Sequence, residues 1–400
     1  MSHQGAASQN GPLTGLRVLE FVGLGPGPHC AMLLADLGAE VVRFERPGGN
    51  GFPNAVTDRG RHVVTVDLKN ESDRALCMRA ATNADVLLEG YRPGVMERLG
   101  LGPTELLRKN PRLVYARLTG WGQDGPLAAR AGHDINYIAV AGALAHIRPV
   151  DGLPVPPLNL VGDYGGGSLF AAFGIMAALW ERERSGQGQV VDAAIVDGTV
   201  SLMALFSGFL ANGSMSLDPK RSLMGGAAPF YRCYRCADGR DISVGPLEPQ
   251  FYAELISRTG APAAYLEGQH DSANWEERSR VFAEIFAKKT RDEWCRIFAG
   301  VDACFAPVLT FEESFQDEHL RARGAYVEID GVQHCAPAPR FSRTPGAIQS
   351  SREGGELLHR WGVEPYSRET FCVGSKLIQR QTSRAVAGRT YSDTKETDLE

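Results

Sequence analysis

The sequence predicts an α/β protein with two parts, a large domain built on a doubly wound parallel sheet and a smaller α+β domain. Residues 16–21 have the pattern of a buried strand, residues 28–37 have that of a helix, and residues 40–44 again have that of a strand. A strand, a helix and a second strand in this order are typical of a parallel sheet with helices packed on it. Beyond Asn212 the pattern changes to short strands followed by amphipathic helices, which indicates a second domain.

The elements of the large domain, expected over residues 1–212, follow in order. The first strand ends in a loop of Gly and Pro residues, and Pro28 is suited to the first turn of the helix that comes next. A second helix-forming run, 168–180, follows a group of glycines. Further strands are expected at 63–66, 86–89, 113–118 and 190–194, with helices between them.

The smaller domain is expected over residues 229–319, after a linker of Ser, Gly, Met and Pro at residues 213–228. Its strands are expected at 231–234 and 241–244, and its helices at 250–257, 275–288 and 291–299. Residues 320–366 are again strand and loop. The polar tail, 367–400, has no apolar stripe and is expected to be mobile.

Composition and charge argue against several classes of function. A net charge of -5 and a pI near 6.0 leave no basic excess for binding nucleic acid. The most apolar helix-like run, 169–180, is about half as long as a bilayer requires, and the polar residues 1–12 lack the apolar core of a secretory signal. Residues 397–400 differ from a Ser-Lys-Leu peroxisomal address. A cytoplasmic protein without a membrane partner is therefore expected.

The eight cysteines are scattered and form no disulfide framework. Cys233 and Cys236 have the spacing of a zinc or redox motif, but no second pair accompanies them. Because the residues around them alternate like a strand, buried free thiols are expected there and no metal site.

A glycine pattern near the N-terminus imitates a dinucleotide-binding fingerprint. Gly23, Gly25 and Gly27 follow the first strand, and Glu45 lies about twenty residues further on. The spacing is Gly-x-Gly-x-Gly, however, and the two prolines of this loop remove N–H donors that a pyrophosphate would need. Arg46, a better phosphate ligand, follows Glu45 directly. A Rossmann-like sheet without a nicotinamide cofactor is therefore expected.

Two motifs carry residues suited to acid–base chemistry. Gly132-His133-Asp134-Ile135-Asn136-Tyr137 places an imidazole between a glycine and a carboxylate, and Gly162-Asp163-Tyr164-Gly165-Gly166-Gly167 places a carboxylate at a glycine loop before a helix. If His133 and Asp163 meet on opposite sides of one carbon atom, they can invert it through a planar enolate. Taken alone, the first motif is also compatible with a histidine in a turn, and the second with a helix N-cap.

The two motifs resemble those of the α-methylacyl-CoA racemases, a branch of the family III CoA-transferases in the CaiB/BaiF superfamily. The resemblance runs in order from about Leu16 to about Pro345, which is most of the chain. Besides the two motifs, it rests on residues 19–21, 25–28, 35–43, 66–69, 92–96, 225–231 and 247–252.

The resemblance implies the site, the substrate and the assembly. His133 and Asp163 would be the two acid/base residues, and Glu248 would correspond to a carboxylate that holds the histidine. The substrate would be an acyl-CoA thioester, with no cofactor and no metal. In the family the returning segment threads two subunits through one another, which implies an interlocked homodimer. The residues expected to contact CoA are Arg46, Val66, Asp67, Leu68, Lys69, Arg92, Arg98, Gly132, Asp134, Ile135, Asn136 and Tyr137.

Three functions remain compatible with these residues. A 2-methylacyl-CoA racemase would use His133 and Asp163 as alternating base and acid, with the enolate oxygen held by the backbone N–H of Asp163 or of the following glycines. A CoA-transferase would use Asp163 as a nucleophile and form a mixed anhydride. A CoA-binding scaffold without activity is the third. His133 and Glu248 favour racemisation, because nucleophilic transfer needs no proton acceptor across the α-carbon. The physiological acyl chain and the pathway are not fixed by the sequence.

Overall fold

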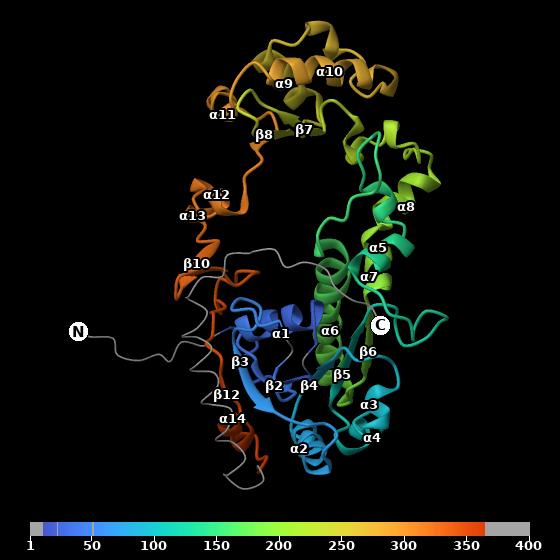
Figure 1. The fold of residues 1–400 in the computed structure, drawn as a ribbon, viewed down its shortest axis with the longest axis vertical. Helices are drawn as coiled ribbons and strands as arrows, with labels where there is room; N and C mark the ends of the chain where they lie inside the picture. The colour runs from blue at the N-terminus through green and yellow to red at the C-terminus, as the bar shows by residue number, and fades with distance from the viewer. Residues whose placement is uncertain (1–10, 22, 50–51, 365–400) are drawn as a thin grey trace, which may run out of the picture.

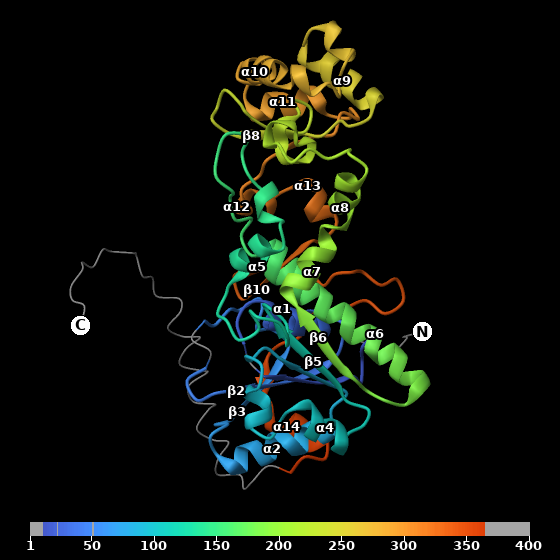
Figure 2. The same cartoon turned by 90° about the vertical axis from the view of Figure 1, so that its right-hand side faces the viewer.

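The computed structural model describes residues 11–21, 23–49 and 52–364. The expected tail at 367–400 and the first ten residues lie outside this range. The described chain is elongated, with a large lobe and a small lobe joined by two connections (Figure 1). The large lobe holds the main sheet, and the small lobe holds three short strands and three helices (Figures 1 and 2).

The main sheet has seven parallel strands. Six of them and the parallel arrangement were predicted from the sequence, and the seventh, β12, belongs to the returning segment. Their order is β12-β3-β2-β1-β4-β5-β6, and β1 lies between β2 and β4, where the direction of strand progression reverses. Ligand sites in such sheets form outside the carboxyl ends of the strands at this reversal. The strands are β1 (Arg17–Phe21), β2 (Glu40–Glu45), β3 (Arg61–Thr65), β4 (Val86–Glu89), β5 (Val114–Thr119), β6 (Val190–Ala194) and β12 (Arg352–Glu353).

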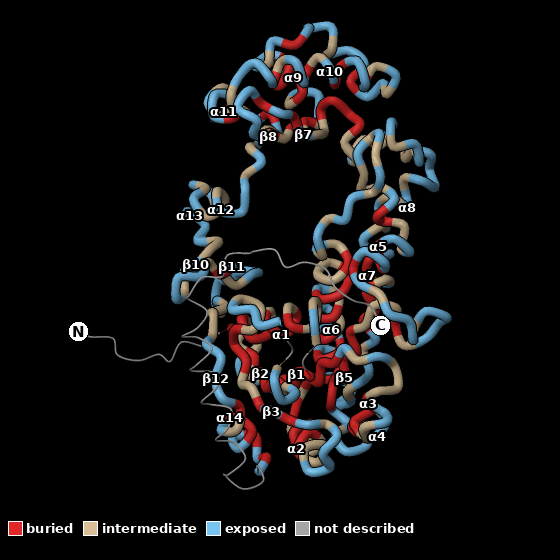
Figure 3. The backbone as a smooth tube through the Cα atoms, viewed as in Figure 1, coloured by how far each residue is buried: buried red, intermediate tan, exposed pale blue. Residues whose placement is uncertain are grey.

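Helices cover both faces of this sheet, because its strands are apolar on both sides. Val18 of β1 packs with α1 (Pro26–Asp36) and α6 (Phe170–Ser185), whereas its neighbour Leu19 packs on the opposite face. The helices on that opposite face are α2 (Glu71–Thr82), α4 (Pro103–Lys109) and α14 (Gly355–Arg360). Figure 3 shows the buried strands between these layers. The doubly wound fold is thus confirmed.

The glycine run around Asp163 is helical, which corrects the expectation of a loop. Residues Leu160–Leu169 form a wide π-helix that continues directly into α6. The glycines allow it to pack on the backbone of α7 (Ile195–Leu202), since a Cβ on Gly166 would lie 2.8 Å from the nitrogen of Thr199. The glycines therefore serve close helix contact at this place.

The combined helix Leu160–Ser185 is also longer than the sequence indicates. Its 26 residues are long and apolar enough to cross a membrane by length and composition, so the expectation that no segment meets that test is wrong. Its exposed apolar residues Leu169, Phe173, Met176 and Trp180 recur at helical spacing and form one stripe. We call this the α6 stripe. Core helices of soluble proteins pass the same length test, which makes it weak evidence for a membrane span.

The small lobe is an antiparallel sheet covered by helices around its own apolar core. Phe230, Phe282, Phe286 and Trp294 are among the core side chains. Cys236, just after the strand Arg232–Arg235, is buried as expected. Cys233 is exposed, because successive residues of a strand face opposite sides and its neighbour Tyr234 faces the core. The elements are β7 (Arg232–Arg235), β8 (Asp241–Val244), β9 (Phe305–Pro307), α9 (Pro249–Thr259), α10 (Trp275–Phe286) and α11 (Arg291–Phe298).

Two connections join the lobes (Figure 1). The outgoing one contains α7 and α8 (Ala204–Ala211), and none of the residues of α8 is buried. The helix α5 (Asp134–Val140), which comes earlier in the chain, packs beside α7. The returning one contains α12 (Phe311–Ser314), α13 (Glu318–Ala322) and the hairpin of β10 (Tyr326–Ile329) and β11 (Val332–Cys335) before it reaches β12. The short helical segments are α3 (Val95–Arg98), Leu144–His146, Pro219–Arg221, Leu223–Ala227, Ala263–Leu266 and Ser272–Asn274.

Candidate active site

A cavity of about 460 Å³ opens at the carboxyl ends of β1, β4 and β5, beside the first turn of α1. Both predicted acid/base residues, His133 and Asp163, line it. This is the edge of a doubly wound sheet where ligands bind. The other lining residues are Leu24, Gly25, Pro26, Gly90, Tyr91, Arg92, Pro93, Leu118, Thr119, Gly120, Trp121, Ala128, Arg130, Ala131, Gly132, Tyr137 and Ile195.

Asp163 is half-buried in the π-helix, and its carboxyl lies against the first turn of α1. A Cβ on Gly25 would come within 2.9 Å of its Oδ2, so only a glycine leaves room there. Asn159 donates a hydrogen bond from Nδ2 to the same oxygen at 3.4 Å. Burial raises the pKa of Asp163, and the nearby Asp134 charge adds to the increase, while Asn159 and His133 oppose it. Compared with a solvent-exposed aspartate, this site thus shifts the equilibrium of the carboxyl toward its protonated form.

His133 immediately precedes α5, with its side chain exposed at the cavity. Its backbone N–H donates to Asn136 Oδ1 at 3.0 Å, which satisfies a free donor at the helix start. The hydroxyl of Tyr137 donates to the carbonyl of Gly132, and the Tyr137 ring meets Trp121 edge-on at 4.8 Å. These contacts fix the backbone that presents the imidazole.

Asp134, expected as a CoA contact, does not line the cavity, and its side chain binds the backbone of Asp163. Its side chain is buried, and its Oδ2 accepts the backbone N–H of Asp163 at 2.7 Å. Its Oδ1 is buried and has no hydrogen-bond partner among the described residues. The N–H of Asp163 that the sequence suggested for an enolate oxygen is therefore already engaged by a carboxylate.

The predicted CoA contacts divide into two groups. Arg92, Gly132 and Tyr137 line the cavity, whereas Arg46, Val66, Asp67, Leu68, Lys69, Arg98, Ile135 and Asn136 lie outside its lining. Arg46 donates from Nε to the carbonyl of Gly49 at 2.8 Å. Val66 is 3% exposed and packs in the core, so its side chain cannot meet a ligand. A contact between CoA and Val66 therefore remains a prediction for the backbone of this residue alone.

Glu248 is not brought to the cavity within one chain. It is exposed and immediately precedes α9, in the small lobe (Figure 1). His133, just before α5, and Asp163, in the π-helix, both line the cavity at the edge of the main sheet in the large lobe. Any contact between Glu248 and His133 would have to involve a second copy of the chain or a movement of the lobe.

Sequence reasoning missed several polar or aromatic residues at the site, among them Arg130, Trp121 and Asn159. Arg130 and Trp121 line the cavity, and Asn159 contacts the Asp163 carboxyl. Arg130 stands three residues before His133, and that proximity to the motif is a usable signal. Asn159 gave no signal, because its contact depends on the wide turns of a helix that the sequence did not predict.

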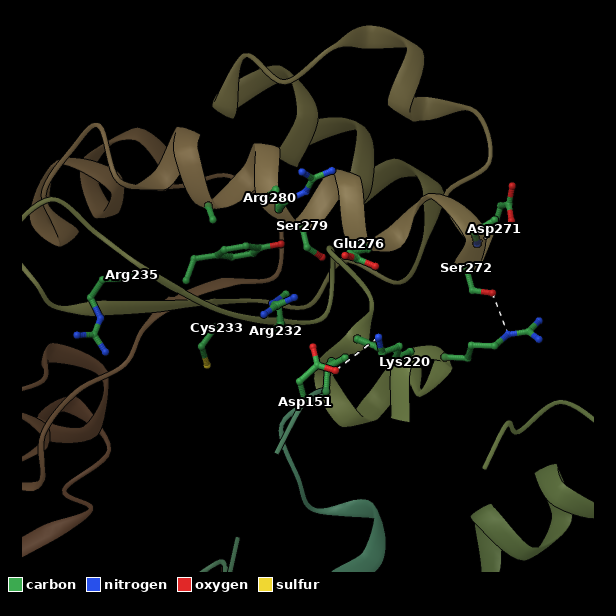
Figure 4. A pocket seen from close by; sticks show the side chains of 16 residues that line it. Asp151, Lys220, Arg232, Cys233, Arg235, Asp271, Ser272, Glu276, Ser279 and Arg280 are labelled. Carbon is green, nitrogen blue, oxygen red and sulfur yellow. Dashed lines mark hydrogen bonds and ion pairs between the residues drawn. The ribbon is translucent and has the colours of Figure 1, made fainter. Parts of the chain in front are cut away.

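Two larger cavities lie elsewhere. One of about 840 Å³ in the small lobe is lined by charged residues, and Lys220 pairs there with Asp151 at 3.5 Å (Figure 4). The other, of about 660 Å³, has an apolar lining that includes Phe209 and Met224. Neither contains a predicted acid/base residue. Within the described ranges, no group of three or more His, Cys, Asp and Glu side chains could hold a metal ion.

Comparisons with known proteins agree with this geometry. Residues 13–352 match the sequence model of the family described as CoA-transferase family III. It is 47% identical to the alpha-methylacyl-CoA racemase of Mus musculus over 88% of this chain and 93% of that protein. The corresponding Homo sapiens racemase is 44% identical over 89% and 94%. A solved CaiB/BaiF family protein from Brucella suis superposes with a TM-score of 0.76 at 27% identity, covering 88% of this chain and 99% of that one. The chain therefore belongs to CoA-transferase family III.

Proposed function

We propose that this protein is a racemase that inverts the α-carbon of 2-methylacyl-CoA thioesters. The observation that carries the proposal is the presence of His133 and Asp163 in one cavity, close enough for their charges to interact. The similarity to proteins named alpha-methylacyl-CoA racemase supports the same reaction. An imidazole and a carboxyl that face one carbon can each remove or return its proton.

In the proposed reaction His133 takes the α-proton from one face of the substrate. The electron pair of the C–H bond moves into the carbonyl and forms an enolate, and protonated Asp163 delivers a proton to the other face. The opposite epimer uses the same residues in exchanged roles. Burial raises the pKa of Asp163, which supports its role as the acid.

An enolate oxygen that binds the backbone N–H of Asp163 would compete with the Asp134 carboxylate, which already accepts that N–H. The N–H of Asp163 donates to Asp134 at 2.7 Å, so an enolate oxygen near it would share or displace that bond.

We expect CoA to be part of the substrate, and we propose that no further cofactor takes part. Exhaustive dialysis against EDTA should then leave the activity unchanged, whereas loss restored by a divalent ion would contradict it.

We further propose that the active unit is a homodimer. The α6 stripe and the unburied helix α8 expose apolar surface, with Phe173 71% and Trp180 70% exposed, which a second copy would cover. In such a dimer Glu248 of the partner subunit could approach His133 and orient its ring. Covering this stripe by protein also agrees with a cytoplasmic location. Sedimentation at micromolar concentration tests the dimer, and a fully active monomer would refute it.

The alternative is a CoA-transferase in which Asp163 is the nucleophile. It is retained because the matched family is described as a family of CoA-transferases. The experiment that separates the two is α-proton exchange in D2O with each epimer of a 2-methylacyl-CoA, beside a transfer assay with a free acid. For a racemase, His133→Ala blocks racemisation in both directions but leaves exchange of the epimer that faces Asp163. For a transferase, loss of Asp163 ends acyl transfer and loss of His133 has little effect. Racemisation by His133→Ala at the wild-type rate would contradict the proposal.

A further inference from the structure

A second histidine contacts the helix that carries Asp163. His29 lies in the first turn of α1, and its ring stacks on that of Tyr164, with centroids 4.1 Å apart and planes 6° from parallel. Its Nδ1 lies 2.6 Å from the hydroxyl of Ser168, which is fully buried. Tyr164 follows Asp163 directly, and Ser168 ends the glycine run. One imidazole thus contacts both ends of the segment Tyr164–Ser168.

The turn that presents His29 is itself anchored. Arg61 is fully buried, donates to the carbonyl of Pro28, and pairs with Glu20 at 3.1 Å. Glu20 is buried as well and also binds Arg43 at 2.9 Å. A buried ion network of this kind holds the backbone next to His29 at the edge of the sheet.

The segment that His29 contacts has little internal stability. A π-helix has wide turns that are rare in proteins, and three consecutive glycines favour helix formation poorly. Relaxation to ordinary α-helical turns would rotate Asp163 relative to α6 and carry its carboxyl away from Gly25. External contacts are therefore needed to keep the wide turns.

We propose that His29 is a positioning residue for Asp163: its stacking on Tyr164 and its bond to Ser168 hold residues 160–169 in wide turns and direct the Asp163 carboxyl into the cavity. The proposal rests on the racemase function above. His29 is not itself a proton carrier of the reaction. Burial, assisted by the charges of Arg61 and Arg59, lowers the pKa of His29 to about 4, so the ring is neutral near pH 7.

Four substitutions separate the two contacts. His29→Phe keeps a ring for stacking and loses the hydrogen bond, and Ser168→Ala loses the same bond from the other side. His29→Asn keeps a polar atom near the place of Nδ1 and loses the stacking, and His29→Ala loses both. His62→Asn is the matched control, because His62 is also half-buried with a pKa lowered by burial but lies on β3.

The first measurement is the ratio of two α-proton exchange rates in D2O, one for the epimer that faces Asp163 and one for the epimer that faces His133. Both rates come from one preparation, so the ratio does not depend on the folded fraction. We expect His29→Ala to lower the Asp163-side rate by about tenfold to 100-fold, the range for a catalytic group displaced by up to an ångström. The His133-side rate should stay within about twofold.

His29→Phe and Ser168→Ala should each lower the Asp163-side exchange rate by the same amount, which should be smaller than the decrease in His29→Ala. The double variant should not lower it further, because all three remove the same hydrogen bond between His29 and Ser168. A wild-type ratio in His29→Ala, or an equal change in His62→Asn, would overturn the proposal.

The second measurement is amide hydrogen exchange of residues 160–169 by mass spectrometry, which needs no substrate. We expect faster exchange there in His29→Ala and unchanged exchange in His62→Asn. Unchanged protection in His29→Ala refutes the positioning role whatever the chemistry. Absence of α-proton exchange on both faces in the wild type refutes the racemase function instead, so the two failures are distinguishable.

Discussion

Replacing Gly25 by alanine tests whether the position of the Asp163 carboxyl limits the reaction. Gly25 precedes α1 and has a φ of 66°, in the left-handed region that side chains disfavour. A Cβ there would lie 2.9 Å from Oδ2 and 3.5 Å from Cγ of Asp163. The substitution therefore has two separable effects, backbone strain and displacement of the carboxyl.

The two effects differ in size and in kind. Gly25 has a φ of 66° and a ψ of -111°, a sparsely populated conformation that costs an alanine about 1–3 kcal/mol of folding stability. The contact of 2.9 Å forces the carboxyl to move by a few tenths of an ångström. Because a shift of 1 Å in an active site can lower a rate about 100-fold, we expect this smaller shift to lower racemisation about tenfold.

Gly100→Ala is the control for strain alone. Gly100 has a φ of 71°, and a Cβ there meets no described atom within 4 Å. Both variants should lower the urea midpoint of unfolding, followed by fluorescence, while only Gly25→Ala loses activity in a chiral assay of the product. Equal loss of activity in both variants would refute the reasoning, and so would wild-type activity in Gly25→Ala.

Three further predictions concern charge at the site. Asp134→Asn keeps an acceptor for the Asp163 N–H but removes a charge that raises the Asp163 pKa, so the limb of the pH–rate profile that reports Asp163 should move to lower pH. Asp163→Asn should raise the thermal unfolding midpoint at pH 7 but not at pH 3. The pKa of Asp163 in the folded state lies above the ordinary 3.8, so at pH 7 the ionised carboxylate destabilises the fold and its removal stabilises it. At pH 3 the carboxyl is mostly protonated in both the folded and the unfolded state, so its removal has little effect. Arg92→Ala should raise KM for acyl-CoA about tenfold with little change in kcat, as steady-state kinetics would show, because a charged hydrogen bond contributes about 1.5–3 kcal/mol.

Most of the fold followed from local patterns. Six strands of the parallel sheet begin and end within two residues of their predicted positions, because buried parallel strands are short runs of β-branched and other apolar residues between turns. The two-residue strand β12 had no predicted position of its own. The helices of the small lobe were predictable for a similar reason, since one face of each is apolar. The wide helix at Leu160–Leu169 was not predictable, because its glycines are poor helix formers in isolation and only their packing on α7 explains them.

The site was predictable in its residue types and less so in its contacts. His133 and Asp163 share a cavity, but Asp134 lies behind Asp163, and Val66 faces the core. Which side of a short segment faces the ligand depends on long-range packing that spacing alone does not encode. The position of Glu248 in the small lobe shows the same limit, because a motif gives no information about where in space its residues lie relative to a distant motif.

The strand β12 has a consequence for how the protein is made. Its partner on β3 is about 290 residues earlier in the chain, since Arg352 pairs with His62. During synthesis the edge of β3 therefore stays open until Arg352 and Glu353 have left the ribosome. An open edge of a parallel sheet is a template for wrong pairing, and contacts at such separation form late. Truncated or stalled nascent chains should accordingly be prone to aggregation, even though they already contain both residues of the acid–base pair.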